Sequence, residues 1–344
     1  MSEPAASAAT CYAICALPRS GSWLLTLGLE DTGLAGTPRP YLCGLPASEP
    51  APGRTRMESI RAAFTVLRRR HAGSNGVFGL KLESTDLPDL MTWSGGDGSF
   101  TGTAGEFLSA LLPGLRYVYL TRHDKTRQAL SLLRGLHELR WMQTSDAVEP
   151  GDWTPDMQHV GAIRQLLVIH EARWEAFFSA TGAEPHRLSY EQLARGDAAY
   201  QHAILGVLRF LGIPARQDLP LPAPRLRKQA GQRTDEWAAR YEAWQAAHDS
   251  AAGSSLPPAL DQVAALPRQA HLLLGDGRLT LDDALRLAQA AGERPVVDRV
   301  LTEMAGGRPV DEALRSVHAA GGGPRLGSQL LRAMGDDDDT TESG

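Results

Sequence analysis

The sequence predicts an α/β fold in which a parallel sheet is flanked by helices and followed by a C-terminal helical extension. Two observations lead to this prediction. Short apolar runs typical of buried strands alternate with longer segments of helical periodicity, as expected for strands joined by crossover helices. The first run, residues 11–17, also breaks at Pro18 and passes through a short polar loop into an apolar helix. With 344 residues, the chain is long enough for one large domain and an appendage.

Four segments have the composition of strands, and helical patterns follow them. We expect strands at 11–17, 77–82, 116–121 and 186–189. We expect helices at 22–31, 56–70, 104–112, 124–140, 158–181 and 198–211. The strongest helical signal is 158–181, where Trp174, Phe177 and Phe178 share one face and Gly182 supplies a stop signal. We assign these aromatic side chains to the core.

Composition also marks the loops and the domain boundary. The stretch 37–54 is rich in Pro and Gly, and 94–105 is rich in Gly, Ser and Thr. Both are predicted loops of the kind that builds substrate sites on an α/β scaffold. We place the main domain at 1–249, a linker at 250–258, a helical extension at 259–320 and a disordered acidic tail at 321–344. Helices in the extension are expected at 259–266, 280–291 and 295–318.

Charge and cysteine usage restrict the function. A net charge of −5 argues against nucleic-acid partners, while clusters of Arg and Lys at 122–134 and 225–233 leave room for a local basic pocket. Cys11, Cys15 and Cys43 lack metal-ligand spacing, so we expect buried thiols, a reducing compartment and no bound metal. With no signal peptide and no transmembrane segment recognisable, the protein is expected to be cytoplasmic.

The loop after the first strand is the strongest candidate site. A strand–loop–helix junction points backbone N–H groups and the positive end of a helix dipole at one place, where an anion is favoured. Gly21 permits close approach, Ser20 and Ser22 offer hydroxyl groups, and Arg19 adds a fixed charge. The loop lacks the spacing and the lysine of a Walker A motif. Taken alone, the loop slightly favours the other interpretation, an ordinary strand–turn–helix junction with a solvated Arg19.

A second candidate anion site follows the third strand. Arg122 lies at the carboxyl end of that strand, and Ser131 lies nine residues later on the following helix. Ligands of open α/β sheets collect at this end of the strands. An Arg fork and a hydroxyl there suit a phosphate, whereas Lys125 and Arg134 fit a solvated helix surface. Two such sites indicate a nucleotide with phosphate at both ends of its ribose.

Over roughly residues 10–245, the chain resembles the sulfotransferases that use 3′-phosphoadenosine 5′-phosphosulfate (PAPS), specifically the bacterial trehalose 2-sulfotransferase family. The resemblance rests on five motifs in order. They are Pro18-Arg-Ser-Gly-Ser-Trp-Leu-Leu25, Thr32-Gly-Leu-Ala-Gly36, Gly79-Leu-Lys-Leu82, Arg122 and Asp124 with Gln128-Ala-Leu-Ser131, and Lys228-Gln-Ala-Gly-Gln-Arg-Thr-Asp-Glu-Trp237. The last segment is the most specific of the five. The family implies a sheet that is P-loop-like and a possible homodimer.

The resemblance also implies roles for individual residues. The 5′-phosphosulfate would be cradled by Arg19, Ser20, Gly21, Ser22 and Trp23. The 3′-phosphate would be held by Arg122 and Ser131, helped by Lys228, Gln229 and Arg233. Tyr190 resembles the family's aromatic residue near adenine, although it also fits a packing residue at a helix start, and Lys228 also fits a solvated side chain. Trp141 suits a pocket wall or the core equally well.

The implied chemistry is in-line sulfuryl transfer from PAPS to a hydroxyl of a sugar, glycolipid or natural product, without a metal. Positioning and charge stabilisation by Arg19 would supply most of the catalysis. The family places a glutamate where this chain has Pro40, so either another base serves, the acceptor needs less help, or activity has been lost. Candidate bases are Glu49, His71 and Glu83, and Glu83 is the first to test because it follows the carboxyl end of the 77–82 strand, near the expected cleft.

Two other function classes remain open at this stage. One is a protein that binds PAPS, or its product adenosine 3′,5′-bisphosphate, and acts through partners without catalysis. The other is a nucleotide-dependent kinase with a divergent phosphate loop. The kinase is disfavoured by the missing lysine and by the segment 228–237.

Overall fold

The computed structural model describes residues 10–44, 53–87, 90, 98–137, 153–226 and 231–249, with scattered positions between 299 and 316. The chain divides into two compact units, one of residues 1–135 and 140–252 and the other of 136–139 and 253–344. The sheet lies in the first unit. The predicted linker, the first two helices of the extension and the acidic tail all lie outside the described residues.

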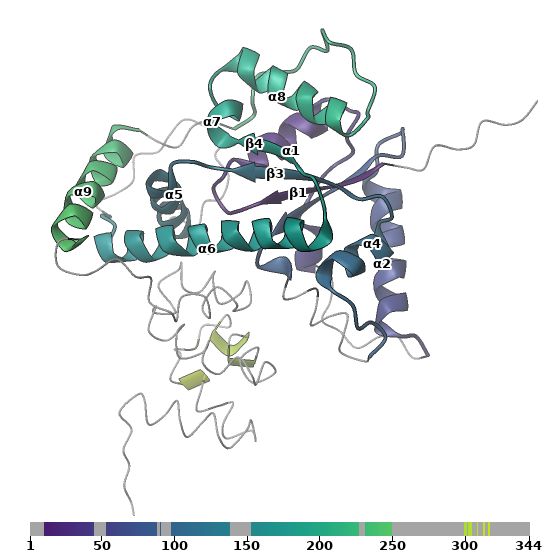
Figure 1. The fold of residues 1–344 in the computed structure, drawn as a ribbon, viewed down its shortest axis with the longest axis horizontal. Helices are drawn as coiled ribbons and strands as arrows, with labels where there is room; N and C mark the ends of the chain where they lie inside the picture. The colour runs from purple at the N-terminus through teal and green to yellow at the C-terminus, as the bar shows by residue number, and fades with distance from the viewer. Residues whose placement is uncertain are drawn as a thin grey trace, which may run out of the picture. The chain divides into compact units, whose positions relative to one another are not determined.

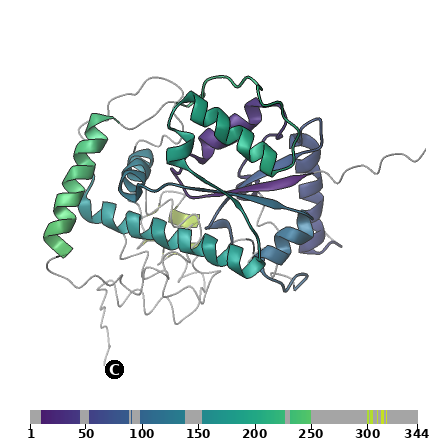
Figure 2. The same cartoon turned by 45° about the horizontal axis from the view of Figure 1, so that its top comes forward.

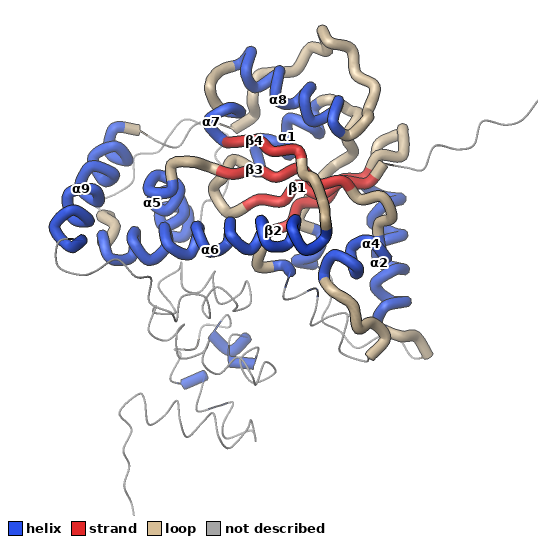
Figure 3. The backbone as a smooth tube through the Cα atoms, in the orientation of Figure 1, coloured by secondary structure: helices blue, strands red, loops and turns tan. Residues whose placement is uncertain are grey.

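Four parallel strands form one sheet in the order β2-β1-β3-β4 (Figure 3). They are β1 (Cys11–Ala16), β2 (Phe78–Glu83), β3 (Arg116–Thr121) and β4 (His186–Ser189). All six residues of β1 are buried, as expected for a central strand covered on both faces. The predicted α/β fold with a parallel sheet is confirmed, and β2 lies one residue later than expected.

One face of the sheet is covered by α1 (Ser22–Asp31), the short helix α7 (Tyr190–Leu193) and α8 (Asp197–Phe210), seen above the sheet in Figure 1. Alternate residues of β1 point into this core, where Tyr12, Ile14 and Ala16 pack with Leu25 and Leu29 of α1. The period of two along β1 therefore fixes which side chains face α1.

The opposite face is covered by α6 (Met157–Thr181), the long helix below the sheet in Figure 1. The predicted core aromatics, Trp174, Phe177 and Phe178, are buried. The two phenylalanines pack against Tyr117 and Tyr119 of β3, and Trp174 packs on the phenylalanines. Gly182 ends the helix with φ 64°, as its sequence position predicts. Beside these lie α2 (Arg56–His71), which contacts β2, and α4 (Ala104–Leu111), which contacts α6.

Three elements were not expected from the sequence. The segment 37–54, predicted as loop, contains the 3-10 turn η1 (Tyr41–Gly44), and α7 begins directly after β4. The longest is α9 (Gln232–Asp249), which crosses the N-terminal part of α6 in both views (Figures 1 and 2). Trp237 and Tyr241 are buried, and their spacing of four was a helical signal in the sequence. The remaining long helix is α5 (Lys125–His137).

None of the described helices combines the length and the apolar content that crossing a bilayer requires.

Close packing between α1 and α8 gives the first testable prediction. A Cβ at Gly28 of α1 would lie 2.3 Å from Tyr200 Oη and 2.7 Å from Ile204 Cδ1, both buried. We expect Gly28→Ala to lower the free energy of unfolding by about 1–3 kcal/mol through overpacking. Gly206→Ala on α8 is the matched control, because the nearest described atom to its Cβ would be His186 Nε2 at 3.9 Å.

Urea denaturation of the two variants tests this packing. Gly206→Ala should be neutral or stabilising by about 0.5–1 kcal/mol, since alanine favours a helix over glycine. Equal stability of the two variants would show that α1 and α8 are not packed as described.

Candidate functional site

The loop between β1 and α1 has a constrained backbone. Arg19 has φ 62°, and among the described residues it is the one non-glycine with positive φ. Gly21 follows with φ 87°. A left-handed arginine costs about 1–2 kcal/mol, and such strain is typical of functional sites. Ser20 is fully buried, and its Oγ donates to the carbonyl of Leu17 at 2.8 Å, which closes the turn.

The structure brings the two predicted anion sites together. Arg19 Nε donates to Ser131 Oγ at 2.9 Å, and Arg122 Nη1 donates to the backbone carbonyl of Arg19 at 3.2 Å. Arg19 follows β1, whereas Arg122 follows β3 and Ser131 lies on α5. These strands are neighbours in the sheet, so their carboxyl ends meet at one edge. Arg19 is therefore hydrogen-bonded to Ser131 and is not a freely solvated side chain.

Arg122 is a buried cation with an unused donor. Its side chain is 7% exposed, and its Nε has no hydrogen-bond partner in the described part of the chain. Burial lowers the pKa of this guanidinium, although the nearby Tyr190, Asp124 and Glu191 act in the opposite direction. An unpaired buried donor costs about 1–3 kcal/mol. A phosphate oxygen would satisfy it, so the site fits an anionic ligand.

Tyr190 lies between the two sites. The Arg122 guanidinium stacks over its ring at 4.5 Å from the ring centre. A Cβ on Gly21 would lie only 2.7 Å from Cδ2 of the Tyr190 ring. The close contact with this ring and the positive φ of residue 21 both require glycine. Ser189 fixes the tyrosine at the start of α7, because its hydroxyl caps the helix at the backbone of Gln192.

Side chains of α5 and its neighbours hold the loops in place. Gln128 is fully buried and its Nε2 donates to the carbonyl of Pro18 at 2.8 Å, a positioning role missed from the sequence. Lys125 donates to the carbonyl of Arg122 and pairs with Glu171 at 2.6 Å. Glu191 accepts the N–H groups of His123 and Asp124, which ties α7 to the start of α5.

Helix α9 reaches the same edge through an ion pair. Arg127 of α5 pairs with Asp235 in the first turn of α9 at 2.9 Å. Arg233, in the same turn, stacks on the ring of Trp237 at 5.7 Å. Lys228 and Gln229, predicted to assist Arg233, lie outside the described residues. The described part of the 228–237 segment is therefore joined to the helix that carries Ser131.

The side of the loop that faces β2 carries mixed charges. Glu83 is the last residue of β2, not a residue beyond it, and it pairs with Lys81 at 3.0 Å. Lys81 Nζ lies 5.3 Å from the ring centre of Trp23, and the Arg39 guanidinium lies 5.6 Å from it. Arg39 also pairs with Glu30 of α1 at 2.5 Å. Lys81 is buried, and the sequence did not indicate a role for it at this site, as was also the case for Gln128.

The other candidate bases are placed differently. His71 ends α2, where its ring stacks on Tyr41 and its Nδ1 lies 3.2 Å from Thr37 Oγ1. Burial, together with Arg70 and Arg39, lowers the pKa of His71. Glu49 and Trp141 lie outside the described residues. Of the two candidate bases within the described residues, Glu83 is the one paired with Lys81, whose Nζ lies over the Trp23 ring.

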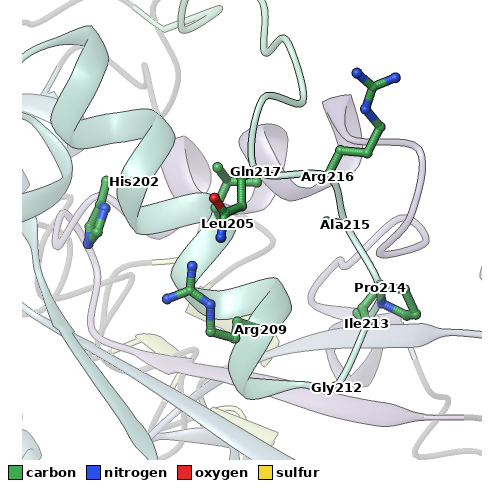
Figure 4. Close-up of a pocket in the computed structure, with 9 residues that line it drawn as sticks. All are labelled: His202, Leu205, Arg209, Gly212, Ile213, Pro214, Ala215, Arg216 and Gln217. Carbon is green, nitrogen blue, oxygen red and sulfur yellow. The ribbon is translucent and has the colours of Figure 1, made fainter.

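A surface pocket of about 540 Å³ lies elsewhere, along α8 and the segment after it (Figure 4). Its lining includes His202, Arg209 and Arg216, and Figure 4 shows the Arg216 side chain extending away from the others. Arg216 pairs with Asp218 at 2.7 Å. None of the predicted site residues lines this pocket, so it is separate from the candidate site.

Comparison with known proteins agrees with the geometry. The family model described as Stf0 sulphotransferase matches residues 11–244, which include the sheet and the described site residues. The trehalose 2-sulfotransferase of Mycobacterium tuberculosis is 30% identical over 261 residues, covering 67% of this chain and 94% of that protein. The trehalose 2-sulfotransferase of Mycolicibacterium smegmatis is 27% identical with the same coverage. The chain therefore belongs to the Stf0 sulfotransferase family.

Proposed function

We propose that this protein transfers a sulfuryl group from PAPS to a hydroxyl of a sugar, glycolipid or natural product. The observation that carries the proposal is the convergence of Arg19, Arg122 and Ser131 at one edge of the sheet. A donor with phosphate at both ends of its ribose needs two adjacent anion sites. The Nε of buried Arg122 supports the fit, because it is a donor with no acceptor among the residues that the structure describes.

In this proposal the loop holds the 5′-phosphosulfate. The residues assigned to it are Arg19, Ser20, Gly21, Ser22 and Trp23. The 3′-phosphate is assigned to Arg122 and Ser131, with Lys228, Gln229 and Arg233. Tyr190 is assigned to the adenine side, where the stacked Arg122 already occupies part of its ring. The N-terminus of α1 adds the positive end of its dipole to the phosphosulfate site.

The residues have distinct tasks in the transfer step. As the acceptor oxygen forms its bond to sulfur, the bond from sulfur to the 5′-phosphate oxygen breaks, and adenosine 3′,5′-bisphosphate is released. Arg19 and the loop N–H groups stabilise the charge that develops on the leaving phosphate. Glu83 accepts the proton of the acceptor hydroxyl as general base.

The proposed acceptor class rests on the names of the two relatives and on one position where this chain differs from the family. Both relatives are named trehalose 2-sulfotransferases, so sugar hydroxyls are the first class to test. Pro40 stands where the family has a glutamate, and proline cannot take a proton. Trehalose is therefore a doubtful acceptor, and a protein that binds the nucleotide without catalysis is the second candidate function.

Nucleotide selectivity tests the donor assignment. We expect the protein to bind adenosine 3′,5′-bisphosphate at least tenfold more tightly than ATP, because only the former places a phosphate at Arg122 and Ser131. Calorimetric titration of both nucleotides measures this difference. Tighter binding of ATP would contradict the assignment.

Two substitutions of Arg19 separate catalysis from folding. Arg19→Ala should abolish transfer of labelled sulfate from PAPS while the protein remains folded, because the charge on the leaving phosphate loses its partner. Arg19→Gly should also lose transfer, yet stabilise the fold by up to about 1–2 kcal/mol, since glycine tolerates φ 62°. Full transfer activity in either variant would refute the loop assignment.

Gly21 gives a further test of the loop, with a matched control. In Gly21→Ala the new Cβ meets Tyr190 at 2.7 Å and also suffers the strain of φ 87°. We expect at least a tenfold loss in affinity for adenosine 3′,5′-bisphosphate. Gly33→Ala places alanine at a comparable φ of 68°, and no described residue comes within 4 Å of its Cβ, so this variant should bind the bisphosphate as the wild type does. Equal affinity in both variants would contradict the proposed role of the Gly21–Tyr190 contact.

A further inference from the structure

The carboxyl end of β2 carries a buried ion pair. Lys81 and Glu83 are 4% and 6% exposed, and Lys81 Nζ lies 3.0 Å from Glu83 Oε1. Removing two charges from water costs several kcal/mol per ion, and well-packed apolar residues often serve stability equally well. A contribution to stability is therefore a weak explanation for the presence of this buried ion pair in the sheet.

The position of the pair is informative. In the register of the sheet, Ile14 is the partner of Lys81 and Ala16 is the partner of Glu83. Partners in a parallel register share a face, and Ile14 and Ala16 face the core beneath α1. The pair therefore lies on the α1 side, one strand away from the loop that contains Arg19. Lys81 Nζ is also 5.3 Å from the ring centre of Trp23 in the first turn of α1.

The backbone of Glu83 is fixed independently of its side chain. Its N–H donates to Asp86 Oδ2 at 2.6 Å. The next residue, Ser84, is buried and has its Oγ 2.8 Å from His170 Nδ1 on α6. The strand end is thus held by its own turn and by a helix on the opposite face. A carboxylate on such a support is preorganised in the way that catalysis requires.

We infer that Lys81 is a positioning residue that keeps Glu83 ionised and fixes its orientation as the general base of the transfer step. This inference rests on the proposed function. Burial disfavours a carboxylate ion, and the adjacent ammonium group of Lys81 compensates for that cost. Among the described residues, the neighbouring charged and titratable groups include Asp86 on the following turn, Arg39 beside β2, and His170 behind Ser84. The Lys81 ammonium group contacts the Glu83 carboxylate directly at 3.0 Å.

Four variants test the inference: Glu83→Gln, Lys81→Met, Lys81→Arg and the double variant Lys81→Met/Glu83→Gln. The assay follows labelled sulfate from PAPS into trehalose, glucose and octyl glucoside, with kcat/KM measured from pH 5 to 9. Calorimetric titration with adenosine 3′,5′-bisphosphate checks the donor site in each variant. Arg187→Met is the control, because it breaks an exposed ion pair with Glu175 far along the sheet from β2.

The expected pattern distinguishes positioning from packing. Glu83→Gln should lower kcat by about 10²–10⁴-fold, the usual contribution of a general base. Lys81→Met should lower kcat/KM at pH 7 by at least tenfold and move the acidic limb of its pH profile to higher pH, because the buried carboxylate then protonates more readily. Lys81→Arg should restore most of the activity. The double variant should be no less active than Glu83→Gln, since Lys81 acts through Glu83.

Each contrary result has a defined meaning. An unchanged pH profile in active Lys81→Met, or a further loss in the double variant, overturns the inference and leaves the proposed function standing. The double variant removes both charges, so it serves even if Lys81→Met alone does not fold. If the wild-type protein binds the bisphosphate but transfers sulfate to none of the acceptors, the proposed function fails for sugar hydroxyls and this inference fails with it.

Discussion

The hydrogen bond from Arg122 to the backbone carbonyl of Arg19 is the contact on which the candidate site depends. It joins the carboxyl ends of β1 and β3, and it does so with a guanidinium that is almost entirely removed from water. The same cation is stacked on Tyr190, which in turn packs against Gly21. Four residues from three strand ends are therefore held in one arrangement, and none of them can move far without disturbing the others.

Local sequence patterns predicted the scaffold well because each strand and its following helix have a recognisable pattern of apolar residues within a short segment. The buried run before Pro18 and the aromatic face of α6 are examples, and both appear as expected. Helix α9 was not predicted because its few apolar side chains are separated by charged residues along most of its length. Its packing on α6, through Tyr241 beside Gly161, is a tertiary contact that no local pattern encodes.

The candidate site was predicted only in part. Residue types and strand ends indicated Arg19, Arg122 and Ser131, yet the bond between Arg19 and Ser131 spans 112 positions of the chain. The roles of Gln128 and Lys81 were missed because a buried polar side chain inside a helix or strand has no local signature. Glu83 was predicted as a strand-end residue, but its ion pair depends on Lys81 sharing its face of the sheet.

The ion pair between Arg127 and Asp235 makes part of the site sensitive to the salt concentration of the solution. Its side chains are 37% and 63% exposed, whereas Arg122 is buried. Mobile ions screen exposed charges over about 8 Å at physiological ionic strength, and they act little on charges inside the protein. The site thus has a salt-resistant half, made by the sheet, and a salt-sensitive half, where the first turn of α9 is attached. Rising ionic strength weakens the Arg127–Asp235 contact between α5 and α9, whereas the packing of buried Trp237 and Tyr241 and the loop of Arg19 are little affected.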